Sequence, residues 1–225
     1  GHHRFEHEGQ LLIDQLAELA EARDAGEIDH TPVVFYDGPL IASFANPLKP
    51  EIRRRYLSTL SRVIAASQHH AIPLVGYVAG SSATELVKMI QLLLREEFAE
   101  DRVIPDAHVL TELMSPWGDT TIPFISKRDA SIDALEETYN GETYEFRDDI
   151  LFSYLNVPPG EGLDRIEFPG WMCRQDGPDG YDSMYEYTVD IVRAQAGIGR
   201  GYPEILQQAD SDAVLDHQDR QQFHR

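Results

Sequence analysis

Three acidic side chains stand where the sequence changes from one expected element to the next. Asp37 ends the apolar run "VVFYD" and is followed by Gly38 and Pro39. Glu85 lies in the first turns of the helix expected after "IPLVGYV", and Asp106 opens a later helical run. A carboxylate at the end of a buried strand costs free energy unless a cation meets it. Hard cations such as Mg²⁺ and Mn²⁺ prefer oxygen ligands, so these acids are candidate metal ligands.

Such a site has a defined chemistry. Two ions about 3.5–4 Å apart activate water and stabilise the leaving oxygen when a phosphodiester is cleaved. Each acid also has a purely structural interpretation. Asp37 suits a turn, Glu85 suits the positive end of a helix dipole, and Asp106 suits an N-cap. Spacing alone leaves both interpretations open.

Other polar residues give weaker signals. Lys88 lies one turn beyond Glu85, and Arg200 lies in the Gly-rich "GIGRG", so both are candidate phosphate contacts. Asp119 in "WGDTT" is typical of a turn. The sequence contains no P-loop, no H-E-x-x-H and no G-x-S-x-G motif.

The composition is strongly acidic. The 225 residues carry a formal net charge of -20 and only three lysines. Abundant Asp and Glu with almost no Lys is typical of salt-adapted proteins, in which concentrated salt screens repulsion among carboxylates. An ordinary acidic protein is the alternative. The net charge argues against nucleic-acid binding, but an acidic surface can still hold a local Arg-lined groove.

The cysteine content and the lengths of the apolar runs indicate the cellular compartment in which the protein is expected. Cys173 is the only cysteine, which excludes an internal disulfide and a Cys-cluster zinc site and fits a reducing cytoplasm. No run of about 18 apolar residues is present, so no membrane helix is expected. The first ten residues lack an apolar signal core, so the expected location is cytoplasmic.

Hydrophobic periodicity predicts an α/β fold in which a mixed sheet is flanked by helices. We expect one domain, residues 1–225, with an N-terminal helix in 1–30 and a core in 31–225. The expected helices cover 8–25, 50–69, 82–98, 107–114, 182–196 and 203–223. The expected strands cover 32–37, 40–45, 71–80, 121–126, 141–149, 150–157 and 164–172.

Eight segments in order carry a family resemblance: "FYDGPLIASF", "PLVGYVAGSSATELVKMI", "DAHVLTELM", "WGDTTIPF", "ILFSYLNV", "DRIEFPGWM", "GYPEILQQADSDAV" and "DRQQF". Over residues 32–223 the chain resembles the NurA nuclease family, and its acidic composition is similar to that of a haloarchaeal member. The resemblance implies a ribonuclease H-like fold and a Mn²⁺-dependent DNA nuclease, with Mg²⁺ as the alternative ion. It implies 5′-to-3′ exonuclease and single-strand endonuclease action in end resection at double-strand breaks. It also implies a homodimer that docks on the hexameric HerA translocase.

The resemblance assigns its acidic ligands to Asp37, Glu85 and Asp106. Glu96 or Glu97 is the alternative for the second acid. Tyr202 falls where it would contact the DNA strand. Asp119 is a further accessory candidate.

Two positions depart from the family pattern. Thr120 stands where the family usually has Arg, and Asp210 stands where it often has His. Asp210 cannot act as a cation but can supply a metal ligand.

The preferred function is therefore a metal-dependent DNA nuclease. The departures at Thr120 and Asp210 motivate one alternative, a catalytically degenerate protein that binds DNA ends beside the translocase. A metal phosphohydrolase acting on nucleotides is a third hypothesis.

Overall fold

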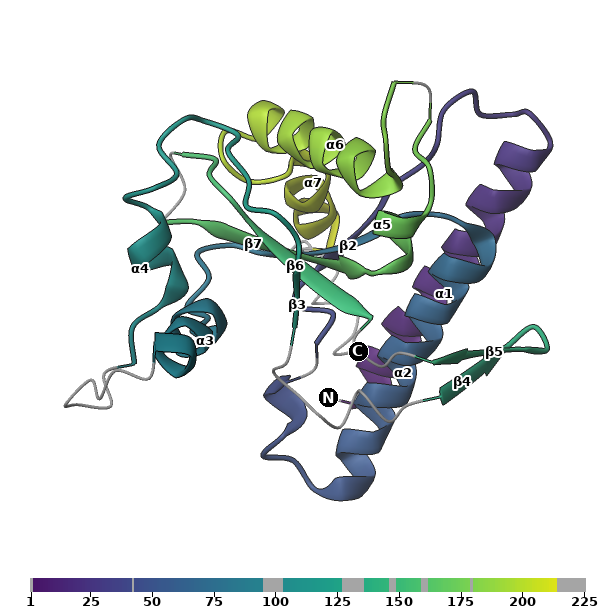
Figure 1. Ribbon diagram of the computed structural model, residues 1–225. Coiled ribbons are helices and arrows are strands. Elements are labelled where there is room, and N and C mark those ends of the chain that lie inside the picture. The colour runs from purple at the N-terminus through teal and green to yellow at the C-terminus, as the bar shows by residue number, and fades with distance from the viewer. Residues whose placement is uncertain are drawn as a thin grey trace, which may run out of the picture.

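A five-stranded mixed sheet forms the centre of the molecule (Figure 1). The computed structural model describes residues 2–41, 43–94, 103–126, 136–145, 149–158, 162–178 and 180–213. In sheet order the strands are β1 (Val34–Asp37), β2 (Leu74–Val78), β7 (Asp164–Pro169), β6 (Ile150–Leu155) and β3 (Phe124–Ile125). A separate hairpin consists of β4 (Glu136–Tyr139) and β5 (Glu142–Glu145). The helices are α1 (His2–Asp24), α2 (Pro50–His70), α3 (Glu85–Leu94), α4 (Asp106–Leu110), α5 (Trp171–Arg174), α6 (Met184–Ile198) and α7 (Glu204–Ala213), with the 3-10 turn η1 (Ser43–Ala45).

Strand directions bring several chain segments to one end of the sheet. β1 and β2 are parallel, and Asp37 pairs with Tyr77. β7 runs antiparallel to both β2 and β6, so its first residue, Asp164, pairs with the last residue of β6, Leu155. One end of the sheet therefore holds the last residues of β1, β2 and β6 and the first residue of β7. We call it the loop end of the sheet.

Helices cover both faces of the sheet (Figure 1). On one face α6 and α7 pack over Val75, Tyr77, Ile166 and Phe168. On the other face α1 and α2 lie side by side and enclose Val34 and Leu74. The apolar stripe of α2, which includes Leu57, Leu60 and Ile64, explains why this helix is buried along one side. Alternate residues of each strand thus serve two cores.

The mixed α/β class is confirmed, and so are the main helices and strands. The expected strand 40–45 is wrong, because Gly38 has a φ of 136° and the chain turns back over β2 instead of extending. Leu40 and Ile41 are buried in that loop, which is why the run looks like a strand. The expected strand 164–172 ends at Pro169, and α5 follows. The predicted ends 95–98 and 214–223 of two helices lie outside the described residues.

The sequence predicted no membrane helix, and the structure agrees for the part that it describes. No helix there is both long and apolar enough to cross a bilayer.

Gly76 permits the loop after Asp37 to lie against β2. A Cβ atom at Gly76 would stand 2.7 Å from the carbonyl oxygen of Gly38 and 2.9 Å from Cγ of Leu40. Both contacts are closer than real Cβ atoms make, and one of them is with backbone. The absence of a side chain at this position therefore fixes the path of the chain beyond Asp37.

We predict that Gly76→Ala lowers the free energy of unfolding by about 1–3 kcal/mol, because the loop 38–41 must shift to admit the methyl group. Urea denaturation followed by circular dichroism measures this change. Gly197→Ala in α6 is the matched control, since a Cβ there meets only Trp117 at 3.5 Å. The control is expected to be neutral or slightly stabilising. Equal stability of Gly76→Ala and the wild type would contradict the close approach.

Candidate metal centre at the loop end of the sheet

Asp37 is held by a residue from the other end of the chain. It is the exposed last residue of β1, and its Oδ1 accepts a hydrogen bond of 2.9 Å from the hydroxyl of Tyr202. The Tyr202 ring packs edge-on against Tyr77, the residue paired with Asp37, at 5.4 Å between centroids. The segment before α7 is thereby fixed beside the end of β1.

Tyr202 stands among several negative charges. Burial raises its pKa, and the hydrogen bond to Asp37 and the charges of Asp210 and Asp164 raise it further. The phenol therefore keeps its proton and remains a donor to Asp37. The accessory candidate Asp210, on α7, thus contributes to the raised pKa of Tyr202.

Asp164 is a residue of this region that the sequence analysis did not single out. It is buried, accepts hydrogen bonds from the Tyr77 hydroxyl and the Gly80 amide, and has a pKa raised by burial. The only sequence signal was an acid opening the apolar run "DRIEFP".

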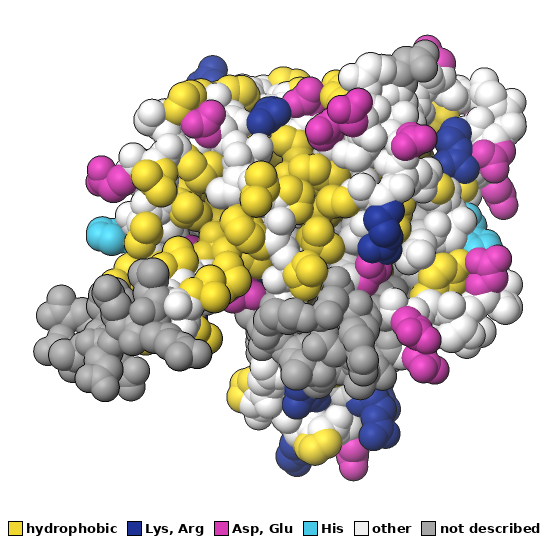
Figure 2. All heavy atoms as spheres, viewed as in Figure 1, with side chains coloured by type: hydrophobic (Ala, Val, Ile, Leu, Met, Phe, Trp, Pro, Cys, Tyr) yellow, Lys and Arg dark blue, Asp and Glu magenta, His cyan; other side chains and the backbone are white. Residues whose placement is uncertain are grey.

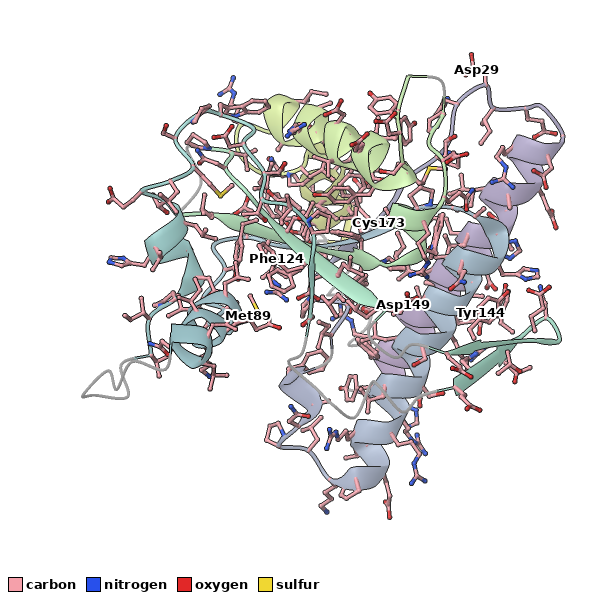
Figure 3. All side chains as sticks on the ribbon, viewed as in Figure 1. Asp29, Met89, Phe124, Tyr144, Asp149 and Cys173 are labelled. Atoms are coloured by element: carbon pink, nitrogen blue, oxygen red, sulfur yellow. The ribbon has the colours of Figure 1, made fainter. Side chains whose placement is uncertain are left out.

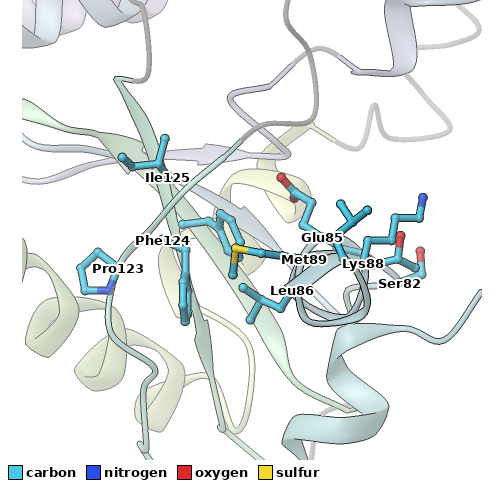
Figure 4. Close-up of a pocket in the computed structure, with 12 residues that line it drawn as sticks. Ser82, Glu85, Leu86, Lys88, Met89, Pro123, Phe124 and Ile125 are labelled. Atoms are coloured by element: carbon cyan, nitrogen blue, oxygen red, sulfur yellow. The ribbon is translucent and has the colours of Figure 1, made fainter. Parts of the chain in front are cut away.

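Glu85 begins α3 on the opposite face of the sheet. The hydroxyl of Ser126 donates to its Oε1 at 2.6 Å, and Nη1 of Arg165 lies 2.7 Å from its Oε2. The side chain is 17% exposed. Glu85 also lines a pocket of about 1040 Å³ between α3 and β3. Figure 4 shows Met89 and Leu86 on the helix side of this pocket and Phe124 on the strand side.

Asp106 is fully buried and serves as a cap for a different helix. Its Oδ2 accepts the Leu86 amide at 3.0 Å and the Tyr154 hydroxyl at 2.7 Å, while its Oδ1 accepts the Val87 amide at 2.9 Å. These amides belong to the first turn of α3, where backbone donors have no helical partner. Asp106 thus accepts the amide hydrogen bonds that an N-cap residue accepts, although it lies outside α3.

The remaining candidates lie on several different elements. Lys88 is exposed on α3 and extends away from Phe124 (Figure 4). Arg200 is exposed just before Tyr202 and has a positive φ of 56°. Asp119 precedes Thr120, which bridges to Leu155 on the side of β6 away from β7, so Asp119 lies about 19 Å from β1 at ordinary strand spacing. Glu96 and Glu97 lie outside the described residues.

The donors differ in how well they fit a metal ion. Among the described residues no group of three or more His, Cys, Asp or Glu side chains is arranged to hold one. Asp37 fits best, because its carboxylate is exposed at a strand end. Both oxygens of Glu85 are engaged by Ser126 and Arg165, and both oxygens of Asp106 accept hydrogen bonds, but Glu85 is partly open to a pocket and Asp106 is fully buried. One or two carboxylates suffice for Mg²⁺ or Mn²⁺ when water and phosphate complete the shell, so the exposed Asp37 fits such a site, and Glu85 and Asp106 stay candidate ligands whose oxygens are engaged by protein groups in this structure.

We expect Asp106→Asn to lower the free energy of unfolding by about 1–3 kcal/mol, since its amide NH₂ would face a backbone N–H of Leu86 or Val87. The measurement is urea denaturation in buffer free of divalent metal. Asp210→Asn, an exposed carboxylate on α7, is the control and should change stability by less than about 0.5 kcal/mol. A residue needed only for metal binding would not lose stability here, so an unchanged Asp106→Asn would rule out the cap.

Comparisons with known proteins assign the chain to a family. No curated protein and no solved structure matches the chain. A family model described as the NurA domain matches residues 4–215, which is nearly the whole chain. The chain belongs to the NurA family, a family of nucleases involved in DNA end processing.

Proposed function

We propose that this protein is a metal-dependent deoxyribonuclease that hydrolyses phosphodiesters at DNA ends, with Asp37 at its catalytic centre. In this proposal it acts as a 5′-to-3′ exonuclease and single-strand endonuclease in resection of double-strand breaks. It works as a homodimer on a HerA-type hexameric translocase. The hydrogen bond between Asp37 and Tyr202 carries the proposal, because it joins the exposed acid candidate to the accessory candidate Tyr202 across 165 residues of chain.

The residues have distinct tasks in the proposed reaction. Asp37 is the ligand of a Mn²⁺ ion, with Mg²⁺ as the alternative, and Glu85 is the candidate for a further ligand. When bound, such ions supply an activated water and stabilise the departing oxygen. Tyr202 orients the Asp37 carboxylate through its hydroxyl. Asp106 orients Glu85 indirectly, by fixing the first turn of α3. Lys88 and Arg200 extend from the elements that carry Glu85 and Tyr202 and suit contacts with phosphate.

A local group of Lys and Arg side chains supports the proposal that the substrate is a polyanion, although the net charge of the protein is negative. Figure 2 shows Lys and Arg side chains gathered at the lower end of the molecule, where α2 begins. We call this group the α2 basic cluster: Lys49, Arg53, Arg54, Arg55 and Arg62. Arg54, Arg55 and Arg62 line a hollow of about 400 Å³ with Ser58, Thr59 and one acid, Glu6, which lies 3.6 Å from Arg55. Closely spaced guanidinium and hydroxyl groups are the usual contacts to a DNA backbone.

Exposed apolar side chains support the proposed assembly. Several large apolar residues of α3 and of the chain around β3 are exposed, and they form a broad apolar area in Figure 2. They are Met89, Ile90, Leu92, Leu93, Ile122 and Ile125. Contiguous apolar surface of this kind marks protein–protein contact more often than free surface. It suits a homodimer or a translocase interface.

The geometry also gives weight to the alternative, a DNA-end-binding partner without catalysis. Asp106 is fully buried, and both of its carboxylate oxygens accept hydrogen bonds from the protein. Thr120 accepts a hydrogen bond of 3.2 Å from Arg193, which gives this residue a structural role. Asp210 supplies a negative charge where the family often has a His. A protein with this function would bind DNA ends and its partner but would not cleave.

The deciding experiment compares wild type with Asp37→Asn on 5′-labelled single- and double-stranded DNA, in Mn²⁺, Mg²⁺ or EDTA, at low and at molar salt. We expect Mn²⁺-dependent cleavage that Asp37→Asn reduces by more than about 100-fold, beyond the loss caused by outer-shell substitutions. Asp29→Asn, an exposed acid in the loop after α1, is the control and should keep full activity. A folded wild type that binds DNA without cutting it would favour the binding partner instead.

The α2 basic cluster is tested by salt dependence. In an Asp37→Asn background, Arg54→Gln with Arg55→Gln should weaken single-stranded DNA binding. It should also reduce the slope of log K against log salt by about 1.4, the value for two lost phosphate contacts. Arg23→Gln with Arg174→Gln removes the same charge elsewhere and should leave the slope nearly unchanged. Equal slopes for the two double variants would show that the cluster does not contact DNA.

A further inference from the structure

A buried chain of charged contacts joins the two halves of the candidate centre. Nη1 of Arg165 lies 2.7 Å from Oε2 of Glu85, and Nε of Arg165 donates to Oε1 of Glu167 at 2.8 Å. Oε2 of Glu167 accepts the backbone amide of Ile41 at 3.1 Å. Ile41 belongs to the loop 38–41 that follows Asp37. The contacts therefore run from Glu85 on α3, through β7, to the loop 38–41 beyond β1.

The chain of contacts lies out of water. Arg165 and Glu167 are both 0% exposed, and the guanidinium carbon of Arg165 lies 3.6 Å from the centre of the Phe152 ring. Burial acts to lower the pKa of Arg165, but the carboxylates of Glu167 and Glu85 outweigh it, so the pKa lies above its usual value. The cation is thus retained, and it ties both carboxylates to one place.

Stability alone is a weak reason for such a group. Replacing a buried ion pair by apolar residues of similar size is often neutral or stabilising, because desolvation offsets the attraction. The group also links three segments, namely α3, β7 and the loop 38–41. Asp37 and Glu85 lie on opposite faces of the sheet, and β2, with Gly76 at the point of closest approach, lies between the loop 38–41 and β7.

We propose that Arg165 and Glu167 are positioning residues, whose buried contacts from Glu85 to the Ile41 amide hold Glu85 and Asp37 at a fixed separation. The structural part of this inference stands by itself. Its consequence for metal binding and cleavage rests on the proposed function.

The first test measures the separation directly, without metal or DNA. Nitroxide labels at Asn46→Cys, after η1, and Lys88→Cys, on α3, are placed in a Cys173→Ser background, and pulsed EPR gives their distance distribution. Both label sites are exposed. Arg165→Met with Glu167→Gln removes one charge of each sign and keeps an amide oxygen for Ile41. We expect a shifted or broader distribution, and an unchanged mean and width would overturn the proposal.

A matched control separates positioning from general loosening. Arg174 and Asp149 form another Arg–carboxylate pair, at 2.9 Å, and Asp149 precedes β6 at the far end of the sheet (Figure 3). Arg174→Met with Asp149→Asn should leave the distance distribution unchanged. If the main double variant does not fold, Glu167→Gln alone keeps the Arg165–Glu85 pair and should give a smaller broadening. Identical distributions for Glu167→Gln and its parent would then overturn the proposal.

The second test uses Mn²⁺ affinity, measured by EPR of free Mn²⁺ without DNA. Arg165→Met with Glu167→Gln should bind Mn²⁺ about 10–100-fold more weakly, as outer-shell substitutions do, while the control pair binds normally. A lower melting temperature with normal Mn²⁺ affinity would mean a structural role only. If the wild type shows no Mn²⁺ binding sensitive to Asp37→Asn, the proposed function fails, and the label distances still decide the positioning.

Discussion

The charge of Arg165 is the constraint around which the loop end of the sheet is organised. A guanidinium removed from water must be met by carboxylates, or the cost of burying it exceeds what the fold can bear. Glu167 meets it from the same strand and Glu85 from α3. The position of α3 against β7 follows from this requirement. Since Glu167 also holds the Ile41 amide, the loop beyond Asp37 is bound to the same charge.

Acidic side chains in this molecule have different tasks because their surroundings differ. Asp106 is surrounded by donors and stabilises the start of α3. Glu85 is shared between Arg165 and Ser126 at the wall of a pocket. Asp37 has a single tyrosine donor and faces solvent. Of the acids that the family resemblance selects, Asp37 is the one whose surroundings leave it most free to meet a cation or a substrate.

Much of the fold follows from local pattern. The stripe on α2 and the apolar run of β2 correspond to elements with nearly the predicted bounds. The run 40–45 does not, because burial of Leu40 and Ile41 in a loop gives the same pattern as burial in a strand. That difference depends on Gly76, some 35 residues away, whose missing side chain admits the loop.

The sequence by itself determined the α/β class and the family, and it selected Asp37 and Tyr202 as candidate site residues. It offered two readings of Asp106, ligand or cap, and could not show that the capped helix is α3, twenty residues earlier. It does not indicate that Arg165 is buried, because a charged residue within a predicted strand is expected to face solvent unless its partners are known. Tertiary structure decided these points, since the partners of a buried charge and of a helix end come from distant segments that only the folded chain brings within hydrogen-bonding distance.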